Sequence, residues 1–215
     1  MPQVEKKLND AHHLCWSCRE EIGEGPFCQN CITIQPLDEL GDYFTLFGLQ
    51  RRYQINTDYL KTKYYQLSRK FHPDFFGDKS ATELELARDN SAYLNTALKT
   101  LGDPILRAEY LLKLTGANAA GQPAPPLELF DEIMEIGELL VEGDPLTESD
   151  RAKLEKSRQN FKARQLKLIA SLNEAFDRLL NGDDEVRDLL EGRLNNIRYL
   201  RTILRRIDHR LKNRV

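Results

Sequence analysis

The sequence predicts an all-α protein with a helical hairpin, a C-terminal three-helix bundle and a small cysteine-rich segment in front of them. Three observations lead to this prediction. Apolar residues recur at helical spacing almost everywhere after residue 40, and no strand-like alternation occurs beyond the cysteine region. All four cysteines lie in the first 38 residues. With 40% hydrophobic and 30% charged residues, the 215-residue chain has an ordinary globular composition.

Changes in composition divide the chain into four predicted parts. Residues 1–38 contain the cysteines, and Pro36 closes this segment. Residues 40–115 hold a cluster of short helices, and residues 116–126, "GANAAGQPAPP", have the uncharged Gly, Ala and Pro composition of a linker. The remainder, 127–215, is predicted to form the three helices of an antiparallel bundle. The breaks between these helices are "EGDP" at 142–145 and "NGDD" at 181–184.

The cysteines form two C-x-x-C pairs, "CWSC" at 15–18 and "CQNC" at 28–31, with nine residues between them. Each pair can place two thiolates on one ion, and the turn-rich spacer allows the pairs to face each other. Two disulfides or a redox motif are the alternatives, but the chain shows neither a signal peptide nor a βαβ pattern. The sequence therefore predicts a structural Zn²⁺ site, and its ligands are Cys15, Cys18, Cys28 and Cys31.

The tripeptide His72, Pro73 and Asp74 separates two predicted helices. One apolar stripe extends from Leu60 to Phe71 before it, and another extends from Leu84 to Leu101 after it. Because proline keeps the preceding residue out of the α region, the first helix is expected to end at about His72. The tripeptide then lies at the tip of a helical hairpin. Beside it, the first helix carries a cationic side made of Lys63, Arg69 and Lys70.

The first helix of the predicted bundle has two apolar stripes. One is predicted to be core and contains Leu129, Ile133, Ile136 and Leu140. The other lies about 100° or more away round the helix and contains Phe130, Met134 and Val141. The second stripe has an acidic border, which favours contact with a partner protein over burial in the bundle. The border consists of Asp131, Glu135, Glu138 and Glu142.

The last predicted helix supplies one further candidate, Tyr199. Its predicted core stripe is Val186, Leu190, Ile197, Leu204 and Leu211. Tyr199 lies far from that stripe, and an aromatic residue outside the core is a candidate interface anchor.

Charge is unevenly distributed along the bundle. Residues 128–150 carry nine Asp or Glu and no Lys or Arg, whereas residues 151–215 carry 17 basic and nine acidic residues. Complementary faces of neighbouring antiparallel helices explain this pattern. A nucleic-acid site is the alternative, but aromatic residues are not interleaved with the basic ones beyond Tyr199, so no nucleic-acid partner is expected.

Neither a membrane nor a secretory route is expected. No window approaches the roughly 18 apolar residues of a membrane span. The start, "MPQVEKKLND", has neither an apolar signal core nor the Arg-rich bias of a transit peptide. The expected compartment is a bacterial cytoplasm, with the mitochondrial matrix as the alternative for a processed protein.

Two stretches, "YYQLSRKFHPDFF" and "SAYLNTALKTLGDPILRAEYLL", resemble a J-domain. With "DYFTLFGL" (42–49), "RAEYLL" (107–112) and the acidic bundle, they are similar to the HscB family, the J-proteins dedicated to iron–sulfur cluster transfer. The resemblance covers about residues 41–211, and forms of the family with an N-terminal tetracysteine zinc segment account for the cysteines. It implies a co-chaperone that contacts an HscA/DnaK-type chaperone and stimulates its ATPase, and that is not itself an enzyme. The implied chaperone-binding residues are Lys63, Arg69, Lys70, His72, Pro73 and Asp74.

The same resemblance implies a second partner, the cluster-assembly scaffold IscU, bound by the C-terminal bundle. The implied scaffold-binding positions are Phe130, Met134, Glu135, Glu138, Glu142 and Tyr199. Asp131 departs from the family pattern, which has an apolar contact there. Two alternatives stay open: a J-protein that serves another client, and a zinc-bearing protein that binds nucleic acid. Weak self-association also stays open.

Overall fold

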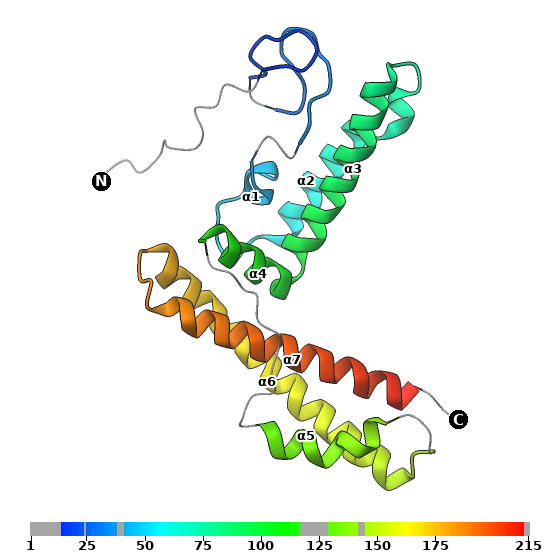
Figure 1. Ribbon diagram of the computed structural model, residues 1–215, viewed down its shortest axis with the longest axis vertical. Helices are drawn as coiled ribbons and strands as arrows, with labels where there is room; N and C mark the ends of the chain where they lie inside the picture. The colour runs from blue at the N-terminus through cyan, green and yellow to red at the C-terminus, as the bar shows by residue number, and fades with distance from the viewer. Residues whose placement is uncertain (1–13, 24, 38–40, 117–128, 142–144, 213–215) are drawn as a thin grey trace. The chain divides into compact units, whose positions relative to one another are not determined.

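The computed structural model describes residues 14–23, 25–37, 41–116, 129–141 and 145–212 (Figure 1). Within these ranges the protein is helical, and its β structure is limited to two isolated antiparallel bridges, Leu14 with Glu21 and Phe27 with Ile34. The prediction of an all-α fold is confirmed. No helix among the described residues is long and apolar enough to cross a membrane. The chain divides into two compact units, Met1–Arg51 with Ile55–Gly102, and Arg52–Gln54 with Asp103–Val215.

The first unit contains the predicted hairpin. Its elements are α1 (Tyr43–Leu46), α2 (Thr57–Lys70), the short 3₁₀ helix η2 (Pro73–Phe76) and α3 (Ala81–Gly102). The Asn56 side chain accepts hydrogen bonds from the first turn of α2, which fixes where this helix begins. At the other end His72 adopts an extended conformation before Pro73, so α2 stops where the sequence predicts. The buried side chains of the two helices and of the α2 C-cap include Leu60, Phe71, Ala87, Leu94 and Leu101.

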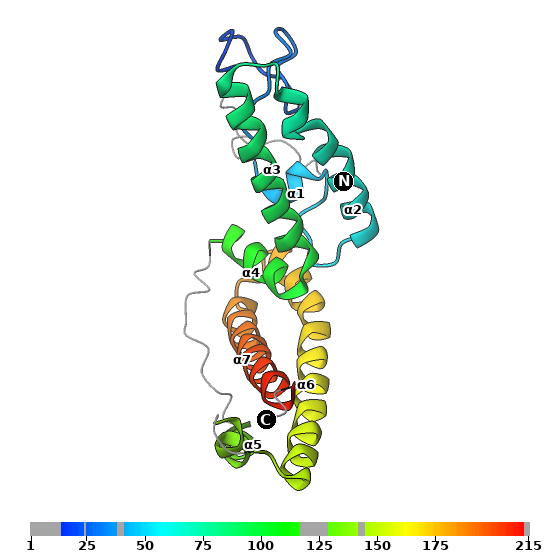
Figure 2. The ribbon, with the colours of Figure 1, turned by 90° about the vertical axis from the view of Figure 1, so that its right-hand side faces the viewer.

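The second unit contains α4 (Pro104–Leu114), α5 (Phe130–Gly137), the 3₁₀ helix η4 (Glu138–Leu140), α6 (Glu148–Leu180) and α7 (Val186–Lys212). Helices α6 and α7 run antiparallel, side by side (Figure 2). Helix α4 belongs to this unit, where its N-cap residue, Asp103, pairs with Arg201 of α7 at 2.8 Å and Glu109 pairs with Arg198 at 3.1 Å. Burial raises the pKa of Asp103, but the N–H groups of Leu106 and Ile105 together with Arg201 outweigh it and lower that pKa.

The predicted domain boundary follows α4, whereas the compact units divide before it. Most of the predicted linker, residues 117–126, lies outside the described residues. The four-part division of the chain therefore stays a prediction.

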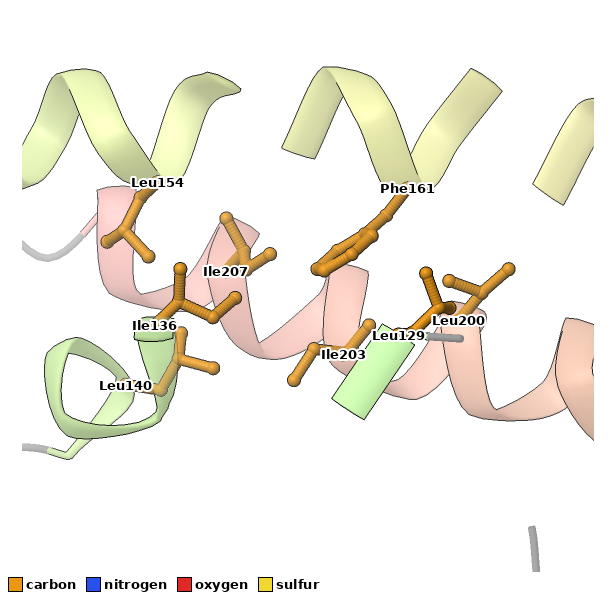
Figure 3. Close-up of a cluster of buried hydrophobic side chains, with 8 residues drawn as sticks. All are labelled: Leu129, Ile136, Leu140, Leu154, Phe161, Leu200, Ile203 and Ile207. Carbon is orange, nitrogen blue, oxygen red and sulfur yellow. The ribbon is translucent and has the colours of Figure 1, made fainter. Parts of the chain in front are cut away.

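One hydrophobic cluster holds α5 and η4 against α6 and α7 (Figure 3). Its eight buried side chains point toward one another from these elements. The α5 stripe predicted to be core contributes three of them and, with Ile133, packs here as expected. The eight are Leu129, Ile136, Leu140, Leu154, Phe161, Leu200, Ile203 and Ile207.

The core stripe of α7 differs in part from the prediction. Val186, Leu190 and Ile197 are buried, but Leu204 and Leu211 are only partly buried. A strict seven-residue spacing drifts by roughly 20° per heptad round a straight α-helix, so the later members turn away from the core. Leu200, Ile203 and Ile207 take their place.

Candidate functional site

The four cysteines come together in the first unit. All four Sγ atoms lie within 4.8 Å of one another, and the Cys15–Cys31 and Cys18–Cys28 distances are both 3.6 Å. Tetrahedral thiolate ligands with metal–sulfur bonds of about 2.3 Å stand about 3.8 Å apart, so the spacing fits one metal ion. The distances are far longer than a disulfide bond of about 2.05 Å, and all four thiols are free.

Hydrogen bonds to sulfur hold these side chains in place. The N–H groups of Ser17 and Cys18 donate to Cys15 Sγ at 3.4 and 3.5 Å, and the Gln35 amide donates to the same atom at 3.3 Å. Such donors orient metal ligands and stabilise their thiolate form. The cluster therefore has both the spacing and the supporting donors of a metal-binding site.

The thiols differ in acidity. A hydrogen bond with the Thr33 hydroxyl lowers the pKa of Cys31 to about 6. The backbone N–H of Cys31 lowers the pKa of Cys28, but burial and proton sharing with neighbouring thiols outweigh it and raise that pKa to about 11. A cation that binds all four as thiolates must therefore displace protons, which makes its binding pH-dependent.

The His-Pro-Asp tripeptide forms the exposed connection between α2 and α3. His72 is the N-cap of η2, and its Nδ1 accepts a hydrogen bond from the backbone N–H of Asp74 at 3.4 Å. Both side chains are exposed, at 57% and 85%. The structure thus places the predicted tip residues together and accessible. No pair of a nucleophile with its base is formed by these three residues.

The predicted cationic residues lie on α2. Arg69 and Lys70 are exposed in its last turn, next to the tripeptide. Lys63 is nearly two turns back and half-buried, with its Nζ 5.5 Å from the centre of the Tyr59 ring. Positive charge at a helix C-terminus is favourable because it faces the negative end of the helix dipole.

The second stripe of the bundle is exposed as predicted. Phe130 is 50% exposed, Met134 is 62% exposed and Val141 is also exposed. Two members of the acidic border, Glu135 and Glu138, are exposed beside them, as is Asp131. Glu142 lies outside the described residues. We call the exposed side chains Phe130, Met134, Glu135, Glu138 and Val141 the α5 face.

Tyr199 differs from its predicted environment. It is half-buried on α7 and packs partly against the hydrophobic cluster, rather than lying outside the core. The reason is the drift of the α7 core stripe, which brings Leu200 and Ile203 into the core beside it.

One ion pair joins the acidic and basic segments as the charge pattern predicts, between Arg164 of α6 and Glu132 of α5 at 3.1 Å. Another, between Arg158 of α6 and Asp208 of α7 at 2.6 Å, lies within the basic segment itself. Part of the basic character of α6 is thus neutralised by neighbouring helices.

Phe75 lies near these sites, and two further residues, Asn90 and Gln35, were not singled out from the sequence. Phe75 is exposed and lies edge-on to His72, with 6.2 Å between ring centres. Asn90 and Gln35 are buried polar residues between the cysteine segment and α3. Asn90 could have been recognised as a buried polar residue from its position. It lies three residues after Ala87 and four before Leu94, at the spacing of core residues in an otherwise apolar stripe.

No protein-family model matches the chain. Curated relatives do match it. The chain is 34% identical over 199 residues to the iron-sulfur cluster co-chaperone protein HscB of Mus musculus, across 90% of this chain and 80% of the relative. It is 35% identical over 164 residues to the HscB homolog of Arabidopsis thaliana, across 76% of this chain and 63% of the relative.

Solved structures give the same family. The crystal structure of human co-chaperone protein HscB superposes with a TM-score of 0.77 at 31% identity, across 92% of this chain and 98% of that one. The chaperone HscB from Vibrio cholerae gives a TM-score of 0.64 at 25% identity, across 79% of this chain and 96% of that one. The resemblance seen in the sequence is confirmed, and the chain belongs to the HscB family of iron–sulfur cluster co-chaperones.

Proposed function

We propose that this protein stimulates the ATPase of an HscA/DnaK-type chaperone and delivers the iron–sulfur scaffold IscU to it, which promotes cluster transfer. The observation that supports this proposal most directly is the exposed His72-Pro73-Asp74 loop, which lies next to the cationic end of α2 in a member of the HscB family. The loop and the residues Lys63, Arg69 and Lys70 bind the chaperone in this proposal. ATP hydrolysis takes place on the chaperone.

The α5 face and Tyr199 bind the scaffold. Exposed apolar side chains with an acidic border suit a partner whose own apolar patch carries basic residues. Phe130, Met134 and Tyr199 are the anchors, while Glu135, Glu138 and Glu142 form the rim. A J-protein for another client would share the loop but not this face, so capture of IscU by the purified protein distinguishes the two. The compartment stays a prediction that cell fractionation tests.

The cysteine cluster holds one structural Zn²⁺. The Sγ spacing fits tetrahedral coordination, and four thiolates complete the shell, so the ion stabilises the segment and leaves no position for a substrate. Elemental analysis of the purified protein is expected to give one zinc per chain. Absence of zinc together with two disulfides in thiol titration would contradict this assignment.

The loop is tested by Asp74→Asn and His72→Gln. Both side chains are exposed, so each variant is expected to keep its fold and lose stimulation of the chaperone's ATPase. The matched control is Asp78→Asn, the same change at an exposed aspartate four residues further on. Turnover of ATP by the chaperone is measured with each variant added. Full stimulation by Asp74→Asn would remove the proposed mechanism.

A further inference from the structure

A buried asparagine joins the cysteine segment to helix α3. Asn90 is 2% exposed, and both ends of its amide are used. Its Nδ2 donates to the backbone carbonyl of Gln35 at 2.8 Å, and its Oδ1 accepts from the backbone N–H of Leu37 at 3.0 Å. Burying an amide is costly unless its partners are supplied, so these two bonds fix the segment on the helix in one position.

The same contact leads directly to the cysteines. The fully buried side chain of Gln35 donates from Nε2 to Cys15 Sγ at 3.3 Å and to the Thr33 carbonyl at 2.8 Å. Its Oε1 accepts from the backbone N–H of Trp16 at 3.4 Å. Gln35 thus touches a ligand of the cluster through its side chain and Asn90 through its backbone.

A second contact joins the segment to the end of α2. The rings of Phe27 and Phe71 stack, with 6.0 Å between their centres and 14° between their planes. Phe27 directly precedes Cys28, and Phe71 directly precedes His72. The Phe71 carbonyl also accepts a hydrogen bond from the Ser91 hydroxyl at 2.9 Å, one residue along α3 from Asn90. The Phe27 stack therefore reaches Phe71 directly, whereas Asn90 is linked to it through its neighbour Ser91 on α3.

We propose that Asn90 and Phe27 are positioning residues that couple the cysteine cluster to the His72-Pro73-Asp74 loop. With metal bound, the folded segment holds Phe71 and α3 in place and the loop keeps one conformation. Without metal, Gln35 and Phe27 lose their fixed positions and the loop becomes mobile. The functional consequence, weaker engagement of the chaperone, rests on the proposed function, whereas the coupling itself does not.

The coupling is tested on the full chain with Asn90→Ala and Phe27→Ala. Hydrogen exchange of the amides of residues 71–76 is expected to accelerate about tenfold or more in both variants, because a buried hydrogen-bond pair or ring contact is lost. Release of the bound metal to a chelator is expected to accelerate by a similar factor. Chelation of the wild-type protein should produce the same exchange change, which supplies a test independent of either substitution.

Asn95→Ala is the matched control. Asn95 lies on the same helix and accepts a hydrogen bond from the Tyr64 hydroxyl at 2.7 Å, so the variant loses a bond to α2 without touching the segment. Its metal release should match that of the wild type. In the ATPase assay, Asn90→Ala is expected to raise the co-chaperone concentration for half-maximal stimulation several-fold, while maximal stimulation is kept.

The outcomes separate the two ideas. The coupling would be overturned if the amides of residues 71–76 exchange as slowly in the chelated protein and in Asn90→Ala as they do in the metal-bound wild-type protein. Accelerated exchange with an unchanged half-maximal concentration would overturn its role in chaperone engagement. If the wild-type protein does not stimulate the chaperone at all, the proposed function fails, and the coupling is decided by exchange and metal release alone.

Discussion

At the scale of single residues, two adjacent phenylalanines of the loop have opposite environments. Phe76 is 7% exposed, whereas Phe75 is 68% exposed and contacts the ring of His72. The short 3₁₀ helix causes this difference, because successive side chains point about 120° apart round its axis. Phe76 therefore stabilises the loop, and Phe75 is available to a partner.

The two residues are expected to respond differently to truncation. Phe76→Ala should destabilise the first unit by about 3 kcal/mol, a usual cost for a buried phenylalanine. Phe75→Ala should change its stability by less than about 0.5 kcal/mol, as for an ordinary surface position. Hydrogen exchange of the α2 and α3 amides measures both. Equal destabilisation by the two variants would show that the loop is packed differently.

Functional residues could be predicted from the sequence where the chemistry of their site requires a fixed spacing along the chain. The C-x-x-C pairs and the His-Pro-Asp tripeptide carry their own geometry, and the structure brings each set together. Asn90 could not be assigned, because its partners are backbone groups 53 and 55 residues away. Gln35 could not be assigned either, because its contact with the cluster is a hydrogen bond to the sulfur of Cys15, 20 residues away. Such contacts form only in the folded protein. In the sequence their one sign is a polar residue at a position where the helical pattern predicts an apolar one.

At the scale of elements, the cysteine segment depends on its metal. Among its described residues, three apolar side chains besides the cysteines are buried, Ile22, Ile34 and Leu37, and regular hydrogen bonding is limited to isolated bridges. Helices α2 and α3, by contrast, have an apolar interface that contains no cysteine. The two helices should therefore stay folded when the segment loses its metal, even though the loop at their tip responds to it.

Metal removal is expected to unfold residues 15–31 and to leave the helical signal of residues 40–211 nearly unchanged. Binding of one Zn²⁺ contributes on the order of 10 kcal/mol to a site of this kind, more than so small a segment can replace. Trp16, the one tryptophan of the chain, reports on the segment, because its indole N–H donates to the Ile34 carbonyl at 2.6 Å. Chelation should shift its fluorescence to the red while far-ultraviolet circular dichroism stays constant. Unchanged Trp16 emission after complete metal removal would contradict this expectation.

Element type and the α5 stripes could be predicted because helical periodicity is strong there. The core stripe of α7 could be predicted only near the start of the helix. Residues spaced by seven rotate gradually away from the core side along a helix of 27 residues. The membership of α4 could not be predicted either. Its capping residue, Asp103, is local, but the partner that binds it to the second unit, Arg201, is 98 residues away.

At the scale of the whole molecule, the two proposed binding sites lie on different compact units. The loop belongs to the first unit and the α5 face to the second. A change confined to one site should therefore leave the other functional. The chaperone's response to this protein alone and its response to this protein with scaffold become separate measurements.

The triple change of Phe130, Met134 and Tyr199 to Ala is expected to weaken scaffold binding by roughly a hundredfold, if about 3 kcal/mol is lost. Buried interface anchors typically cost ~2 kcal/mol or more on truncation, whereas carboxylates of a rim act mainly through association rate and salt dependence. Stimulation of the chaperone by the free protein should survive, because His72 and Asp74 are untouched. The additional turnover seen with scaffold should disappear. Calorimetric titration and ATP turnover on the same variant test both expectations.

Two controls make this test specific to the α5 face. Tyr199 also packs on the hydrophobic cluster, so the double change of Phe130 and Met134 separates lost contact from lost stability. Changing three exposed leucines elsewhere in the second unit, Leu166, Leu180 and Leu189, to Ala removes a comparable apolar surface. This control should bind scaffold normally, since it leaves the α5 face intact. Wild-type affinity in both the double and the triple variant would exclude the α5 face as the scaffold site and favour a J-protein that serves another client.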